Sequence, residues 1–104
     1  MHRGAERLTA RLSPDAMRVM DELESDPAND PLVDAIWDTI EFIAEHPTSA
    51  QARRHVLRTQ KGHSIWLVRV SGRHRENPWV VLWQPRGDDA LIAYIGPDDF
   101  RPGR

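Results

Sequence analysis

Apolar and polar residues follow a helical period in the first half of the chain and form strand-like runs in the second half. A Ser-Pro-Asp sequence at 13–15 predicts a helix start, because serine caps a helix and proline suits its first turn. Apolar residues at three- and four-residue spacing extend this helix to about residue 25. An Asp-Pro sequence at 30–31 starts a second helix, which His46 ends because a residue before proline avoids the α conformation.

The second helix, at about residues 31–46, has the clearest amphipathic pattern in the chain. Its isoleucines lie on one side, and four acidic residues lie on the other. Trp37 widens the apolar stripe, so we expect its side chain in the core. The core residues predicted from both halves of the chain are Ile36, Ile40, Ile43, Val68 and Val81.

Strand patterns flank the helices on both sides. Residues 7–12 alternate between polar and apolar side chains, which predicts a short edge strand. Three runs rich in β-branched and aromatic residues, at 65–70, 79–83 and 90–95, predict an antiparallel meander with short polar connections. Residues 48–55 are expected to add one or two helical turns before this meander.

Together these elements predict an α+β fold of order β-α-α-β-β-β. Both helices are expected on one face of an antiparallel twisted sheet, with the other face open. A length of 104 residues fits a single domain, expected over residues 7–100 with flexible ends at 1–6 and 101–104. The chain has no cysteine and no apolar stretch long enough to cross a bilayer, so we expect a cytoplasmic protein without membrane contact.

Charge is divided in the same way as the hydrophobic pattern. Residues 1–52 contain four arginines and eleven acidic residues, whereas residues 53–104 contain ten lysines and arginines and five acidic residues. Between Arg53 and Arg86, eight cations are opposed by Glu76 alone. Such a stretch is typical of a surface that binds a polyanion or an acidic protein. Strand edges that carry cations as protection against aggregation are the alternative interpretation.

Several classes of chemistry lack their motifs in this sequence. A glycine-rich phosphate loop is missing, which argues against nucleotide binding through a P-loop or a Rossmann turn. The five histidines match no compact metal-binding motif, so we expect no metal and no small-molecule cofactor. The two Asp-Asp pairs adjoin glycine or proline, where aspartate is common in turns, so we assign them no catalytic role.

Short sequence motifs follow one another in an informative order. A Leu-Ser-Pro-Asp-Ala sequence leads into the helical pair, and the run 63–70 carries Arg69. The run 80–84 comes next, and the run 91–96 ends in Tyr-Ile-Gly. In this order and spacing the motifs resemble the RelE/ParE superfamily of bacterial toxins, over about residues 7–100. The resemblance implies a RelE-like arrangement of the predicted helices and strands.

The resemblance also implies a function, that of the toxin in a type II toxin–antitoxin system. The implied partner is a cognate antitoxin protein. Ribosome-dependent members of the superfamily cut mRNA in the ribosomal A site, and ParE-like members inhibit DNA gyrase. We therefore expect this chain to act on ribosome-bound mRNA and to arrest translation.

Most catalytic residues of RelE itself are not matched position by position. Two lysines of its second strand fall on Ile65 and Leu67, and two arginines fall on Val80 and Asp98. Its C-terminal tyrosine would fall at or beyond the last residue. Arg69 is the one clear match, and a strand arginine is well suited to hold phosphate through two contacts.

The candidate site residues come from the basic half. RNA cleavage needs an acid or base and cations that stabilise the developing phosphate charge. Histidine titrates near neutral pH, which makes His63 and His74 catalytic candidates beside Arg69. An ion pair between Arg69 and Glu76 would instead give the arginine a structural role. The expected RNA- or partner-binding residues are Arg53, Arg54, Lys61, Arg73 and Arg75.

A non-catalytic role is the main alternative. An open apolar sheet face would suit a protein partner, either gyrase or an antitoxin segment, better than it would suit phosphate. A structural domain with no toxin role is the third interpretation. The residues expected on this open face are Ile65, Leu67, Val80 and Leu82.

Overall fold

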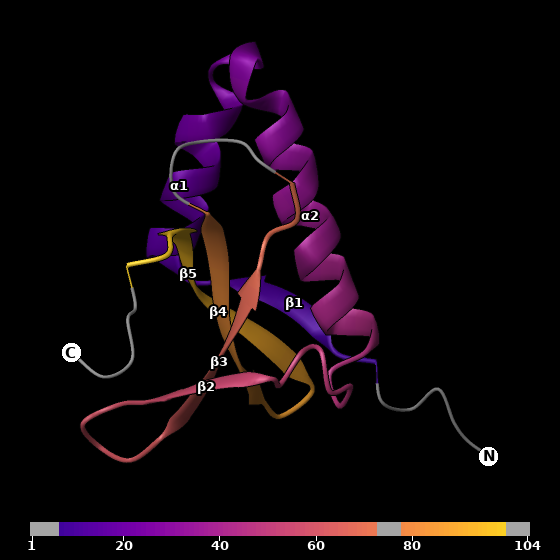
Figure 1. Ribbon diagram of the computed structural model, residues 1–104, viewed down its shortest axis with the longest axis vertical. Coiled ribbons are helices and arrows are strands. Elements are labelled where there is room, and N and C mark those ends of the chain that lie inside the picture. Colours follow the sequence, from indigo (N-terminus) through magenta and orange to yellow (C-terminus); the bar gives the residue numbers. More distant parts are fainter. Residues whose placement is uncertain (1–6, 73–77, 100–104) are drawn as a thin grey trace.

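The computed structural model describes residues 7–72 and 78–99, and within them the chain forms two layers (Figure 1). Helices α1 (Pro14–Glu24) and α2 (Asp30–Glu45), joined by the short 3-10 helix η1 (Pro27–Asn29), cover one face of a five-stranded sheet. The predicted α+β class is confirmed, whereas the ends expected to be flexible lie outside the described residues. The strands are β1 (Thr9–Leu12), β2 (His55–Arg58), β3 (Ser64–Arg69), β4 (Trp79–Arg86) and β5 (Asp89–Pro97).

The sheet is mixed, in the strand order β1-β5-β4-β3-β2. Strand β1 pairs with β5 in parallel, from Thr9 opposite Asp89 to Leu12 opposite Ile92, and the other pairs are antiparallel. The prediction of a wholly antiparallel sheet is therefore wrong at this edge. The sequence does not reveal the direction of β1, because side chains alternate in the same way in a parallel and an antiparallel strand. No hairpin turn joins β1 to β5, so the connection does not reveal the direction either.

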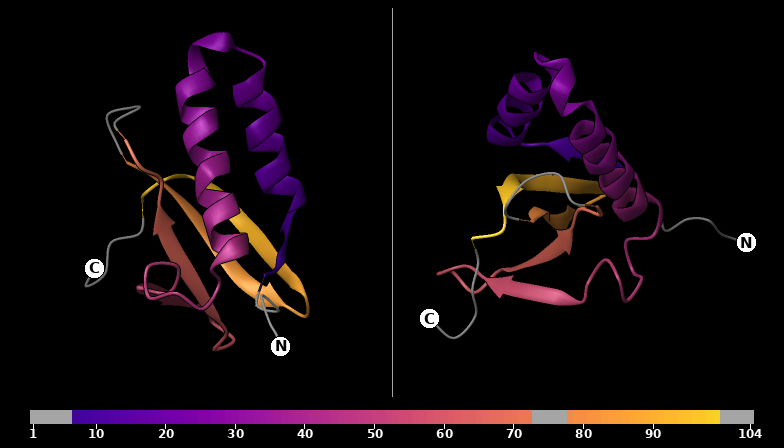
Figure 2. Two further views of the ribbon diagram at one scale, coloured as in Figure 1. Left: turned by 90° about the vertical axis from the view of Figure 1, so that its right-hand side faces the viewer. Right: turned by 45° about the horizontal axis from the view of Figure 1, so that its top comes forward.

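Residues 48–55 do not form the predicted helix. They continue through hydrogen-bonded turns to Arg54, and β2 then pairs with β3 as an antiparallel edge strand. The hairpin between them is closed by hydrogen bonds of 2.9 Å from Thr59 N to His63 O and from Gly62 N to Thr59 O. Gly62 adopts a φ of 83° at this turn, where glycine is favoured. Figure 2 shows β2 at the far edge of the sheet from both helices.

The helical layer covers the predicted core. Each of the five core residues named from the sequence is buried, and Ile36 and Ile43 are fully inaccessible. Trp83 is also fully buried, and its Nε1 donates a hydrogen bond of 3.0 Å to the carbonyl oxygen of Ala52. No helix in the described ranges is both long enough and apolar enough to cross a bilayer.

Trp37 is not a core residue, although it adjoins the apolar stripe of α2. Its side chain is 39% exposed, and its Nε1 donates a hydrogen bond of 3.2 Å to the carboxylate of Glu24 on α1. Ile40, one helical turn further on, is buried over the sheet. The apolar stripe of α2 is thus wider than the sheet beneath it. Trp37 lies at the edge of the contact between the helix and the sheet, where it stays partly exposed.

A β-bulge at Ala93 determines which side chains of β5 face the helices. Leu82 pairs with Tyr94 and Trp83 pairs with Ile92, so Ala93 is the extra residue. The bulge places Ile92 in the core beneath the helices and Tyr94 on the opposite face. Ser13 connects this bulge to α1, because its Oγ donates to Ala93 O and accepts from Ala16 N, both at 3.1 Å.

Candidate nucleic-acid interface

The sheet face opposite the helices brings two candidate groups together. His55 pairs with Leu67, so both side chains lie on the same face, and Arg69 follows two residues later on that face. Such diagonal neighbours have Cα atoms roughly 7–8 Å apart. The side chains of His55 and Arg69 therefore leave the β2–β3 pair from neighbouring positions on one face, and the guanidinium of Arg69 extends to Asp98.

A shallow hollow lies at this position, with a volume of about 130 Å³. It is too small to enclose a nucleotide, since small-molecule pockets usually measure about 300–1,000 Å³. A single phosphate group of a polymer that crosses the surface is a better match. The residues that line the hollow are Gln51, Arg54, His55, Leu67, Val68 and Arg69.

Arg69 forms an ion pair at the end of β3. Its Nη2 lies 3.4 Å from Oδ2 of Asp98, and the side chains are 60% and 10% exposed, respectively. Asp98 is held in place, because its backbone N–H donates a hydrogen bond of 2.8 Å to Pro78 O. Glu76, the partner considered from the sequence, lies outside the described residues. The side chain of Arg69 nevertheless remains largely exposed to solvent.

Tyr94 lies near this ion pair on the same face. Its hydroxyl donates a hydrogen bond of 3.0 Å to Pro97 O, and its ring covers Gly96 so closely that a Cβ there would collide with it. Burial raises the pKa of the Tyr94 hydroxyl above its usual value, and the carboxylates of Asp99 and Asp98 raise it further. The phenol is therefore neutral at physiological pH and a hydrogen-bond donor.

Arg53, one of the expected binding residues, is held within the protein. Its guanidinium carbon lies 4.4 Å from the ring centroid of Trp66 and 5.8 Å from that of Trp83. Its Nε donates a hydrogen bond of 2.6 Å to Pro47 O. Stacking and hydrogen bonding of this kind fix the path of the chain from α2 to β2. Arg54, the next residue, is exposed and lines the hollow instead.

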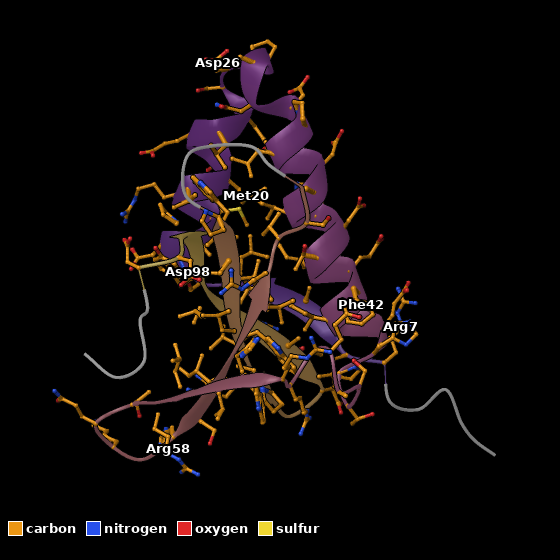
Figure 3. The ribbon with its side chains drawn as sticks, in the orientation of Figure 1. Arg7, Met20, Asp26, Phe42, Arg58 and Asp98 are labelled. Carbon is orange, nitrogen blue, oxygen red and sulfur yellow. The ribbon has the colours of Figure 1, made fainter. Side chains whose placement is uncertain are left out.

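The β2–β3 hairpin carries further exposed cations away from the hollow. Lys61 and His63 lie in its turn, and Arg58 ends β2 beside them, pointing away from the body of the protein (Figure 3). His63 precedes β3 and Arg69 ends it, so an extended strand separates them by roughly 20 Å. The structure therefore does not bring His63 and Lys61 together with Arg69. The remaining candidates, Arg73, His74 and Arg75, lie outside the described residues.

His55 belongs to the same basic half of the sequence, but the sequence favours His63 and His74 over it as catalytic candidates. The pairing that places it beside Arg69 depends on β2, a strand of four residues that the apolar pattern does not predict. Tyr94 was not a candidate, because simple alternation from Ile92 would place it in the core. Neither position has a local sequence signal, since both depend on the register of neighbouring strands.

The face opposite the helices is less open than expected. Leu67, Val80 and Leu82 are buried there as a second small core, with Leu57, Ile65 and Tyr94 packed against them. The predicted apolar docking face is therefore a packed cluster, flanked by the hollow and by polar groups. Among the described residues, no group of three or more histidine and acidic side chains is arranged to hold a metal ion.

Searches of known protein families, of curated proteins and of solved structures found no match to this chain.

Proposed function

We propose that this protein is a toxin-like RNA-binding protein of the RelE/ParE type that acts on ribosome-bound mRNA. The observation that carries the proposal is the hollow beside β2 and β3 that is lined by Arg54, His55 and Arg69. The resemblance of the sequence motifs supports the class of protein. The charge distribution supports a polyanionic target, because chain segment 46–72 contains no acidic residue.

These groups are suited to cleavage of an RNA strand. Arg54 and Arg69 would hold the phosphate and stabilise charge that develops on it. His55 would accept the proton of the 2′-hydroxyl, whose oxygen then bonds to phosphorus. The bond from phosphorus to the 5′-oxygen breaks, and that oxygen takes a proton from water. The products would be a 2′,3′-cyclic phosphate and a free 5′-hydroxyl.

Cell-free translation of a reporter mRNA, followed by primer extension, tests the proposal. The wild-type protein should stop synthesis and leave new mRNA ends within the reading frame. Arg69→Ala and His55→Gln should abolish both effects with only a small change in melting temperature. Arg69→Lys should not restore them, because an ammonium group lacks the two-pronged geometry of guanidinium. Arg18→Ala, which removes an exposed arginine of α1, is the matched control.

A non-catalytic role has one observation in its favour. Asp98, the partner of Arg69, occupies a position where the resemblance implies an arginine, and its carboxylate opposes a phosphate at this site. A relative of this kind would bind gyrase or an antitoxin rather than cut RNA. Translation arrest without cleaved mRNA, or inhibition of DNA supercoiling by gyrase, would favour this alternative. A protein that affects neither translation nor gyrase would contradict both.

A further inference from the structure

A groove between α2 and β1 lies on the opposite edge of the sheet from the β2–β3 hairpin. It has a volume of about 490 Å³ and is lined largely by apolar side chains. Leu8 and Ala10 form its β1 side, and Trp37, Ile40 and Ala44 form its α2 side. Figure 3 shows Arg7 beside the last turns of α2, at one end of this groove.

The groove follows a strand edge that can form hydrogen bonds. Thr9 N donates to Asp88 O and Ser13 N donates to Ile92 O, both at 2.9 Å. In a parallel pair, alternate residues direct their N–H groups toward the neighbouring strand. Ala10 lies between these residues and therefore directs its N–H away from β5, toward the groove. Among the described strands β1 ends the sheet on this side. The outward N–H of Leu8 already donates to Ala44 O of α2 at 2.8 Å, so the part of this edge that can pair with another strand begins at Ala10.

Trp37 adds a large aromatic surface to the mouth of the groove. Its indole is 39% exposed and is held by the hydrogen bond to Glu24. A partly exposed tryptophan with a fixed orientation is typical of protein-binding surfaces, where it provides area at little entropic cost. A strand added beside β1 would lie under α2 and cover this ring.

The charge around the groove selects for a basic occupant. Arg7 lines one end, but its guanidinium lies 3.3 Å from the carboxylate of Glu45. Glu41 lines the groove itself, and α2 carries further exposed carboxylates along its length. The exposed acidic residues of α2 are Asp30, Asp34, Asp38, Glu41 and Glu45.

We propose that this groove binds an extended, basic segment of a partner protein as an additional strand on β1. Main-chain hydrogen bonds to the β1 edge would provide affinity. Alternate apolar side chains of the segment would fill the groove beneath Trp37, and its lysines or arginines would meet the carboxylates of α2. The groove is on a different edge of the sheet from the hollow at Arg69, so this inference does not depend on RNA cleavage.

Binding of two synthetic peptides to the full chain tests the charge and the shape of the groove. The probe is an eight-residue peptide of alternating valine and lysine with blocked ends, and the comparison peptide alternates valine and glutamate. We expect the lysine peptide to bind at least about tenfold more tightly in fluorescence anisotropy. Glu41→Lys should reduce this preference, whereas Asp21→Lys, on α1, should not. Equal binding of the two peptides, or no binding of either, would overturn the proposal.

Ala10→Pro tests strand addition directly. Proline removes the outward N–H of β1 but leaves the bonds from Thr9 and Ser13 to β5, so the fold should be retained. The variant should bind the lysine peptide about tenfold more weakly, as should Trp37→Ala. Met17→Ala, at an exposed apolar residue of α1, should bind normally. Unchanged affinity of Ala10→Pro contradicts strand addition.

Hydrogen exchange of the wild-type protein provides a test that needs no variant. The amide of Ala10 should exchange more slowly when the lysine peptide is bound, because the added strand accepts its hydrogen bond. Unchanged exchange at Ala10 under saturating peptide would exclude a strand on this edge, even if Ala10→Pro fails to fold.

Discussion

Asp98 holds Arg69 at the end of β3, with 3.4 Å between carboxylate and guanidinium, and it also lies near the only tyrosine of the chain. The Arg69 side chain is 60% exposed although Asp98 is only 10% exposed, so solvent screens the pair and its contribution should stay near the value of about 0–1 kcal/mol for surface ion pairs. Asp98→Asn should therefore change the free energy of unfolding by less than about 1 kcal/mol in urea titration. A much larger loss would mean that Asp98 supports the fold rather than the orientation of Arg69.

The same substitution should change the ionisation of Tyr94. Burial, Asp99 and Asp98 all raise the pKa of its hydroxyl, so removal of either negative charge should lower that pKa toward its usual value. The ultraviolet absorbance of the tyrosinate ion reports Tyr94 alone, because the chain contains one tyrosine. Asp88→Asn, in the turn at the other end of β5, is the control and should leave the titration unchanged.

Tyr94 should also make the stability of the protein decrease at alkaline pH. Its pKa is higher in the folded state than the ordinary value of 10.0, which applies to the unfolded chain. The unfolded chain therefore loses this proton first, and the free energy of unfolding falls as the pH rises from that value through the folded pKa. Below the ordinary pKa of 10.0, the contribution of the protonated Tyr94 hydroxyl to stability is fully present. Tyr94→Phe should flatten this part of the stability profile, and an unchanged profile would contradict the assignment.

Arg53 and Arg54 are adjacent but should behave differently. Arg53 stacks on Trp66 and bonds to Pro47 O, so Arg53→Ala should lower the free energy of unfolding by about 1–3 kcal/mol. Arg54→Ala should leave stability nearly unchanged and weaken RNA binding, with a smaller dependence of affinity on salt. Urea unfolding and RNA titration at two salt concentrations measure both effects. The reverse pattern would show that Arg53 is the contact with RNA.

Ser13 should be more important for stability than an ordinary helix cap. Its hydroxyl caps α1 and also donates to the carbonyl of the bulge residue Ala93. Ser13→Ala should cost about 1–2 kcal/mol, at the upper part of the range for lost caps. Ser25→Ala is the matched control, because its exposed hydroxyl contacts only the carbonyl of Glu22 among the described residues. Equal effects of the two substitutions would show that the contact with the bulge contributes nothing.

The elements that were predictable from the sequence have local signals. Helix α2 carries its start, its end and its buried stripe within its own residues, and Ile36, Ile40 and Ile43 are buried as predicted. The exposure of Trp37 was not predictable, because the width of a stripe does not show where the sheet beneath it ends. The family resemblance, and the roles of His63 and His74, remain predictions.

The parts of the candidate site that were missed depend on non-local pairing. Strand β2 is an edge strand of four residues, so its sequence alone does not distinguish it from a turn. His55 faces the hollow only because it is opposite Leu67. Tyr94 faces away from the helices only because Ala93 bulges, and no residue type at this position signals a bulge. Such positions follow from register, which is determined by the whole sheet.

The parallel pairing of β1 with β5 determines how the protein responds to mechanical force. Because Thr9 lies opposite Asp89 and Leu12 opposite Ile92, the beginning of β1 and the end of β5 lie at opposite ends of the pair. Tension between the two ends of the chain therefore pulls the strands along each other and loads their hydrogen bonds together. In an antiparallel pair the same tension would open the bonds one after another. A machine that unfolds proteins by pulling would have to shear this pair before it could reach the core.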